Sequence, residues 1–90
     1  MAWTERQFVI VNALGLHARA AAQLVQTANR FRAEIHVEKD GTQVNGKSIM
    51  GVLTLAAAKG SSITVSVEGE DAEAAMTALA KVIENGFGEK

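Results

Sequence analysis

Four stretches of the chain carry the hydrophobic and polar pattern of β-strands. Residues 7–12 form a run rich in β-branched side chains, and apolar and polar residues alternate over 33–38 and 63–67. Such alternation predicts strands with one buried face. The dipeptide Asp40-Gly41 favours a tight type I′ turn, so we expect 42–45 to return antiparallel to 33–38.

Three other stretches have the spacing of helices. Between about 18 and 30 the apolar residues recur every three or four positions, which predicts a helix with one buried stripe, at Ala21, Leu24, Val25 and Ala28. Ser48 can cap a short helix over 49–57. Asp71 can cap a last helix, which Gly86 ends. The inner face of that last helix is expected at Ala75, Met76, Leu79, Val82 and Ile83.

The order of these elements is strand, helix, strand, strand, helix, strand, helix. Strands that alternate between apolar and polar suggest a sheet covered by helices on one face only. We therefore predict an α+β fold, an open-faced β-sandwich with a four-stranded antiparallel sheet and three helices on one face (βαββαβα), as a single domain over residues 1–90. A ferredoxin-like sheet with an added C-terminal helix has the same order, so the pattern leaves that alternative open.

Composition excludes several classes of function. The chain has no cysteine, which removes disulfides, thiolate metal sites and thiol nucleophiles and favours a reducing compartment, so we expect the cytoplasm. The net charge of -1 and the scarcity of aromatic residues argue against a nucleic-acid partner. The longest apolar run, 49–58, is about half of a membrane span, so no membrane insertion is expected. A domain of this size favours carrying over self-contained catalysis.

Candidate chemistry lies at 15–19, where a loop turns into the first predicted helix. Backbone N–H groups and the positive end of the helix dipole form an anion site there, and Arg19 adds a positive charge two residues after His17. A neutral imidazole at this point is a nucleophile for phosphorus. From spacing alone, an ordinary exposed histidine beside a solvated arginine is the commoner case. His36, on the polar face of its strand, is expected to be a solvated surface residue.

Ser48 has a structural and a functional explanation. A role as helix N-cap would be sufficient to explain it. Phosphorylation would instead place negative charge beside the apolar residues Ile49 and Met50. The unbroken apolar run of 49–58 cannot be buried on every side of a two-layer protein, so part of it is expected to form an exposed docking patch with Leu16.

Two separate segments resemble the HPr family of phosphocarriers in the phosphoenolpyruvate-dependent sugar phosphotransferase system. Gly-Leu-His-Ala-Arg at 15–19, followed by Ala21-Ala22, is similar to the family's phosphohistidine site. Val-Asn-Gly-Lys-Ser-Ile-Met-Gly-Val at 44–52 is similar to its regulatory serine segment. One departure is Ala20, where the family usually has proline; we expect a less rigid but competent site.

The resemblance implies both a fold and a function. It favours the open-faced β-sandwich over the ferredoxin-like alternative. His17 would accept a phosphoryl group at Nδ1 from phosphorylated enzyme I and donate it to IIA domains of sugar permeases, with Arg19 stabilising the group. Ser48 would be the site of an HPr kinase/phosphorylase. The docking surface would include Leu16, Ile49, Met50 and Leu53. The protein would be a monomeric carrier and not an enzyme, with no cofactor or metal.

Other functions fit only part of the sequence, and a metal-binding ferredoxin-like module is disfavoured because the chain lacks cysteines. An acylphosphatase-like hydrolase shares the size and the order of elements, but here the group at the helix start is a histidine nucleophile. An acyl carrier protein is acidic and all-helical, with its serine in an Asp-Ser-Leu context, whereas here the sequence is Lys47-Ser48-Ile49. The closest alternative is a paralogous HPr of a regulatory or nitrogen-linked phosphorelay, which the sequence does not distinguish from one serving sugar uptake.

Overall fold

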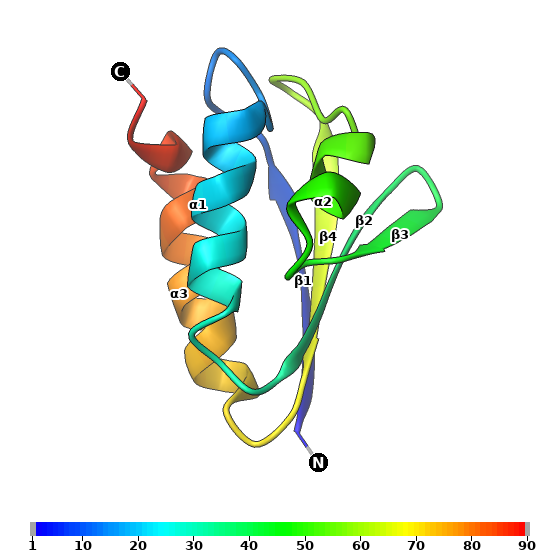
Figure 1. The fold of residues 1–90 in the computed structure, drawn as a ribbon, viewed down its shortest axis with the longest axis vertical. Coiled ribbons are helices and arrows are strands. Elements are labelled where there is room, and N and C mark those ends of the chain that lie inside the picture. Colours follow the sequence, from blue (N-terminus) through cyan, green and yellow to red (C-terminus); the bar gives the residue numbers. More distant parts are fainter. Residues whose placement is uncertain (1, 90) are drawn as a thin grey trace.

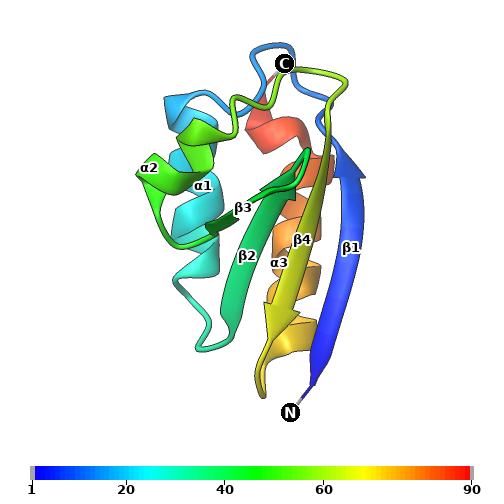
Figure 2. The same cartoon turned by 90° about the vertical axis from the view of Figure 1, so that its right-hand side faces the viewer.

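The sheet and the helices form two layers in a computed structural model that describes residues 2–89. The elements in chain order are β1 (Trp3–Val9), α1 (Ala18–Ala28), β2 (Glu34–Lys39), β3 (Thr42–Asn45), α2 (Ile49–Thr54), β4 (Ser62–Glu68), α3 (Ala72–Glu84) and the 3-10 turn η1 (Gly86–Gly88). The strands form one sheet in the order β1-β4-β2-β3, and each neighbouring pair is antiparallel. Figure 1 shows α1 and α3 against one face of the sheet, and Figure 2 shows its uncovered face. The predicted open-faced β-sandwich is confirmed.

The core lies between the sheet and the helices. The central strands β2 and β4 pair so that Ile35 is opposite Val67 and Val37 is opposite Val65, and all four side chains are buried. The predicted apolar stripe of α1 is buried as well. Burying one such aliphatic side chain contributes about 1.5–3 kcal/mol. The alternating pattern therefore determines which face of the sheet the helices cover.

Two elements differ by three residues or more from the predicted bounds. β1 spans Trp3–Val9 instead of 7–12, because it pairs with β4 from Trp3 opposite Glu68 to Val9 opposite Ser62. Its first residues are mostly polar and are held by the backbone ladder of an edge strand, which no apolar pattern reveals. α2 ends at Thr54 instead of residue 57, and Ala56 adopts the left-handed conformation just beyond it.

The two predicted helix caps have different outcomes. The Oγ of Ser48 accepts a hydrogen bond from the backbone N–H of Gly51 at 3.1 Å, which confirms the cap of α2. Asp71 is at the N-cap position of α3, but its side chain makes no cap hydrogen bond. Its two carboxylate oxygens instead accept from the backbone N–H groups of Arg32 and Ala33, each at 2.9 Å. Asp71 thus ties the segment before β2 to the start of α3, and these hydrogen bonds, that of Arg32 foremost, lower its pKa.

Within residues 2–89, no helix combines the length and the apolar character that crossing a membrane requires.

Candidate functional site

His17 is the N-cap residue of α1. Its backbone is extended, and its carbonyl oxygen accepts the first helical hydrogen bond, from the N–H of Ala21 at 2.8 Å. Its side chain makes no cap hydrogen bond. The first N–H groups of α1 are therefore left for solvent or for a bound anion, and the positive end of the helix dipole favours the anion.

Gly15 holds the loop that places His17 at the helix start. It has a φ of 66°, and a Cβ at this position would lie 2.4 Å from the carbonyl oxygen of Ala57. The same carbonyl accepts from the backbone N–H of Leu16 at 2.8 Å. Only glycine combines this backbone conformation with so close an approach, so the loop before His17 is fixed against the segment after α2.

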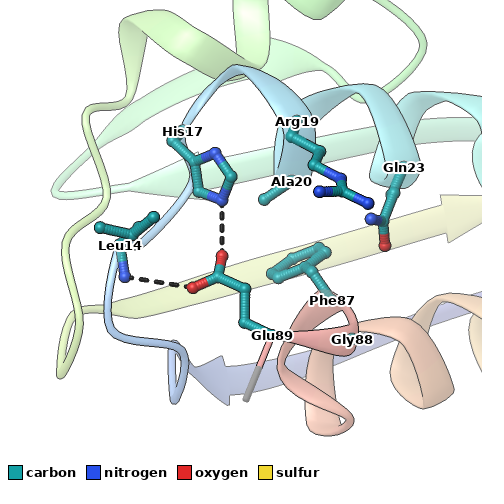
Figure 3. Close-up of a pocket in the computed structure, with 8 residues that line it drawn as sticks. All are labelled: Leu14, His17, Arg19, Ala20, Gln23, Phe87, Gly88 and Glu89. Carbon is teal, nitrogen blue, oxygen red and sulfur yellow. Dashed lines mark hydrogen bonds and ion pairs between the residues drawn. The ribbon is translucent and has the colours of Figure 1, made fainter.

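A carboxylate from the other end of the chain meets the imidazole. The Oε2 of Glu89 lies 2.5 Å from the Nε2 of His17 (Figure 3). The Nδ2 of Asn12 donates to the same oxygen at 2.9 Å, and the backbone N–H of Leu14 is 3.4 Å from Oε1. The 3-10 turn η1 carries Glu89 to this position. Within η1 the side chain of Phe87 is buried, and the backbone of Phe87 has a positive φ of 56°. Residues 12–17 and the C-terminal segment thus form one site.

Glu89 is an ionised hydrogen-bond acceptor at neutral pH. The hydrogen bond with His17 holds the pKa of Glu89 below its ordinary value of 4.5, and those from Asn12 and the N–H of Leu14 act in the same direction against desolvation. The side chains of His17 and Glu89 remain 28% and 21% exposed. Both can therefore be reached by another protein.

A cavity of about 310 Å³ opens beside this pair. Its lining includes His17, Glu89 and the exposed Arg19, with Leu14, Ala20, Gln23, Phe87 and Gly88. In Figure 3 the guanidinium group of Arg19 extends toward Gln23 and not toward the imidazole. Arg19 makes no ion pair with any residue from 2 to 89. Its charge is therefore available to an anion in the cavity, and the structure brings the two predicted residues of the 15–19 segment together.

The predicted docking residues separate into exposed and buried ones. Leu16 is only 4% exposed, so the expectation that it lies on a surface patch is wrong; its side chain belongs to the core. Ile49 and Met50 are 42% and 72% exposed, whereas Leu53 is half-buried against the core. The apolar surface of α2 is therefore formed by Ile49 and Met50, and α2 packs against α1.

Sequence reasoning missed Asn12 and Glu89. Asn12 was assigned to the end of a strand, although an asparagine that opens a loop commonly bonds to the backbone of that loop, as it does here with the carbonyl of Gly15 at 2.7 Å. Glu89 lies 72 residues after His17, so no local spacing indicates their contact. The glycines that flank Phe87 were the one signal that the chain turns back after α3.

The other histidine, His36, lies among acidic side chains and lines a shallow hollow together with Glu5, Glu34, Glu38 and Glu68. His36 lies in β2 on the polar face of the sheet, opposite Asn45 and Ser66 in the neighbouring strands. In the part of the chain that the structure describes, no group of three or more histidine or acidic side chains is placed to hold a metal ion. The cavity beside His17 is therefore the candidate site.

Comparison with known proteins shows which family the chain belongs to. A family model described as the PTS HPr component phosphorylation site matches residues 4–85. The phosphocarrier protein HPr of Xylella fastidiosa (strain 9a5c) is 48% identical over 85 residues, which cover 94% of this chain and 96% of that protein.

Solved structures agree with the sequence relatives. The crystal structure of HPr-C-His from Thermoanaerobacter tengcongensis has a TM-score of 0.93 and 48% identity, and the match covers 97% of this chain and 98% of that one. A second structure from the same organism, described as an HPr dimer, has a TM-score of 0.78 and 50% identity over 91% of this chain and 94% of that one. That dimer bears against the expectation of a monomer. The match in fold decides against the ferredoxin-like alternative, and the chain belongs to the HPr family, the phosphocarrier proteins of the phosphotransferase system.

Proposed function

We propose that His17 accepts a phosphoryl group from phosphorylated enzyme I and donates it to the IIA domains of sugar permeases. The observation that carries this proposal is the arrangement at the start of α1. There a partly exposed imidazole, an uncapped helix N-terminus and the exposed charge of Arg19 border the same cavity. A phosphoryl group carries about two negative charges at neutral pH, and all three features favour it.

The chemistry requires a partner protein. The Nδ1 lone pair of His17 attacks phosphorus, the Nδ1–P bond forms, and the bond from phosphorus to the donor atom breaks with its electron pair left on the donor. Arg19 and the N–H groups of α1 stabilise the charge on the phosphoryl oxygens during both transfers. The cavity beside His17 is open, so a docked partner has to exclude water during transfer. The chain therefore acts as a carrier between proteins, not as an enzyme.

The exposed surface of α2 is proposed as the docking site for these partners. Ile49 and Met50 present apolar area next to α1, and the half-buried Leu53 supports them. Leu16 contributes from the core by fixing the loop under His17. A phosphoryl group on Ser48, added by an HPr kinase/phosphorylase where the host has one, would place negative charge at the edge of this surface. The relay is proposed to operate in the cytoplasm, as the cysteine-free composition suggested.

A reconstituted relay tests this function. The purified protein is mixed with phosphoenolpyruvate, Mg²⁺ and each of the host's enzymes I in turn, and IIA domains are then added. We expect wild type and His36→Ala to be loaded and to pass the phosphoryl group on, and His17→Ala to take up none. Loading of His17→Ala at the wild-type level would contradict the proposal. Loading only by an enzyme I of a regulatory or nitrogen-linked system would assign the protein to that relay instead.

A further inference from the structure

The two ring nitrogens of His17 have different surroundings. Nε2 lies 2.5 Å from the Oε2 of Glu89. Figure 3 shows the other nitrogen, Nδ1, on the far side of the ring, pointing away from the carboxylate. A neutral imidazole carries one hydrogen, and the hydrogen bond made by one nitrogen decides which nitrogen holds it. Glu89 is therefore in a position to distinguish the two nitrogens.

The position of the carboxylate is fixed by other groups. Asn12 is buried, and its Nδ2 donates both to the Oε2 of Glu89 at 2.9 Å and to the carbonyl of Gly15 at 2.7 Å. Both partners are acceptors, so they determine which end of the amide faces them. The Oδ1 of Asn12 is then buried without a partner among residues 2–89, which is unfavourable for folding. The amide of Asn12 thus joins the loop before His17 to Glu89, and it fixes the carboxylate relative to that loop.

In its ionised form the carboxylate of Glu89 has no hydrogen to donate, so it can only accept hydrogen bonds. A glutamate with its ordinary pKa of 4.5 is already ionised at neutral pH, and the hydrogen bonds with His17, Asn12 and Leu14 lower the pKa of Glu89 further. The hydrogen in the contact with His17 must then belong to Nε2. The other charged side chain that lines the cavity, Arg19, makes no ion pair with Glu89 and does not compete for it.

We infer that Glu89 is a positioning residue that keeps the imidazole hydrogen on Nε2 and thereby directs the phosphoryl group to Nδ1. This inference rests on the proposed function of His17. As the Nδ1–P bond forms, the hydrogen stays on Nε2 and the ring acquires a positive charge that faces the ionised carboxylate. On donation the Nδ1–P bond breaks, its electron pair returns to Nδ1, and the ring becomes neutral again. Glu89 thus stabilises the cationic, phosphorylated ring relative to the neutral one.

The first test needs no partner protein. Nitrogen-15 NMR spectra of histidine-labelled protein at neutral pH are compared for wild type, Glu89→Ala and the control Glu84→Ala. Glu84 is likewise a glutamate. It is the last residue of α3 and makes a surface ion pair with Arg6 at 3.5 Å, away from His17. We expect a slowly exchanging Nε2–H of His17 in wild type and Glu84→Ala, and its loss in Glu89→Ala. A hydrogen on Nδ1 in wild type, or the same Nε2–H exchange rate in Glu89→Ala, would overturn the inference.

The second test measures transfer. Loading from phosphorylated enzyme I should slow by about ten-fold or more in Glu89→Ala, the scale of one lost hydrogen bond to a charged group. Phosphorus NMR should show Nδ1 as the acceptor in wild type and a mixture of both nitrogens in Glu89→Ala. Glu89→Gln keeps an acceptor oxygen facing Asn12, so it should restore the Nε2–H signal and the Nδ1 product but only part of the rate.

The outcomes separate this inference from the proposed function. Unchanged rate and unchanged Nδ1 product in Glu89→Ala would overturn the inference and leave the role of His17 intact. Failure of every enzyme I to load wild-type protein would refute the proposed function, and the NMR comparison would still decide whether Glu89 holds the hydrogen on Nε2.

Discussion

Helices α1 and α2 begin with a polar residue in the same extended backbone conformation, yet the two side chains act differently. Ser48 turns back onto α2 and accepts from the N–H of Gly51, so the N-cap residue completes its own helix. His17 turns away from α1 to Glu89 and leaves the helix N-terminus uncapped. A polar N-cap residue whose side chain bonds elsewhere therefore marks a place where the helix terminus is available for a ligand.

Helix α3 shows that an uncapped start is not sufficient for such a site. Asp71 also bonds elsewhere, but its partners are the backbone N–H groups of Arg32 and Ala33, which gives it a structural role. Its negative charge at the helix start would also repel an anion. The start of α1 differs because a nucleophile borders it, together with an arginine that makes no ion pair within residues 2–89.

Among variants that keep both His17 and Glu89, the largest change is expected when Arg19 is removed. Arg19→Ala should slow loading or unloading by roughly ten-fold or more, because a charge-assisted contact to the phosphoryl group is lost. Its stability should change little, since the side chain is exposed. Stopped-flow or quench kinetics with phosphorylated enzyme I measure the effect. Arg30→Ala, an exposed arginine just beyond the other end of α1, is the control and should transfer at the wild-type rate.

Charge at the start of α2 should weaken partner binding without harming the fold. Aspartate is as good an N-cap as serine, so Ser48→Asp should keep or slightly raise the thermal stability. Its charge beside Ile49 and Met50 should lower the affinity for enzyme I several-fold. Ser48→Ala should instead lose about 0.5–2 kcal/mol of stability with near-normal transfer. Titrations of enzyme I with both variants decide this, and equal affinity of Ser48→Asp and wild type would leave Ser48 as a cap only.

A side chain that can cap α1 should stabilise the fold when it replaces His17. The backbone of His17 is already extended, so a serine there can accept from an N–H in the first turn. His17→Ser should be more stable than His17→Ala by about 1 kcal/mol in urea unfolding, with neither variant labelled. Both lack the contact with Glu89, so their difference isolates the cap. Equal free energies of unfolding for the two variants would show that the first N–H groups of α1 are not free to bond with a capping side chain.

The smallest effect is expected at Asp71 and depends on pH. Its pKa is lowered in the folded protein, so its stabilising contribution is complete above its ordinary value of 3.8 and is lost as the pH falls through the folded pKa. The free energy of unfolding of Asp71→Asn should therefore depend less on pH than that of wild type between neutral pH and roughly pH 2. Parallel pH profiles would show that the hydrogen bonds from Arg32 and Ala33 do not favour the ionised form.

The fold was largely predictable because its signals are local. The alternation of apolar and polar residues predicts β2 and β4, and the helical spacing predicts the buried stripe of α1. The dipeptide Asp40-Gly41 predicts the turn between β2 and β3, where both residues have positive φ. The first half of β1 was not predictable, because pairing with β4 and not an apolar pattern holds it.

The site was predictable only in part. His17 and Arg19 lie in one motif, and the structure places both beside one cavity. Asn12 and Glu89 were missed because a turn after α3 brings them to His17, and a contact over 72 residues leaves no spacing to detect. The sequence groups Leu16 with the apolar run 49–58 as a docking patch, whereas the structure buries Leu16 in the core, next to the close approach at Gly15.

The most direct test of the account is to locate the phosphoryl group on the loaded protein. Wild type is phosphorylated by enzyme I and phosphoenolpyruvate, digested under alkaline conditions that preserve phosphohistidine, and mapped by tandem mass spectrometry. We predict that the phosphoryl group is on His17 alone, that His36→Ala gives the same map, and that His17→Ala carries none. A phosphoryl group on His36 or any other residue of the loaded wild type would contradict the account.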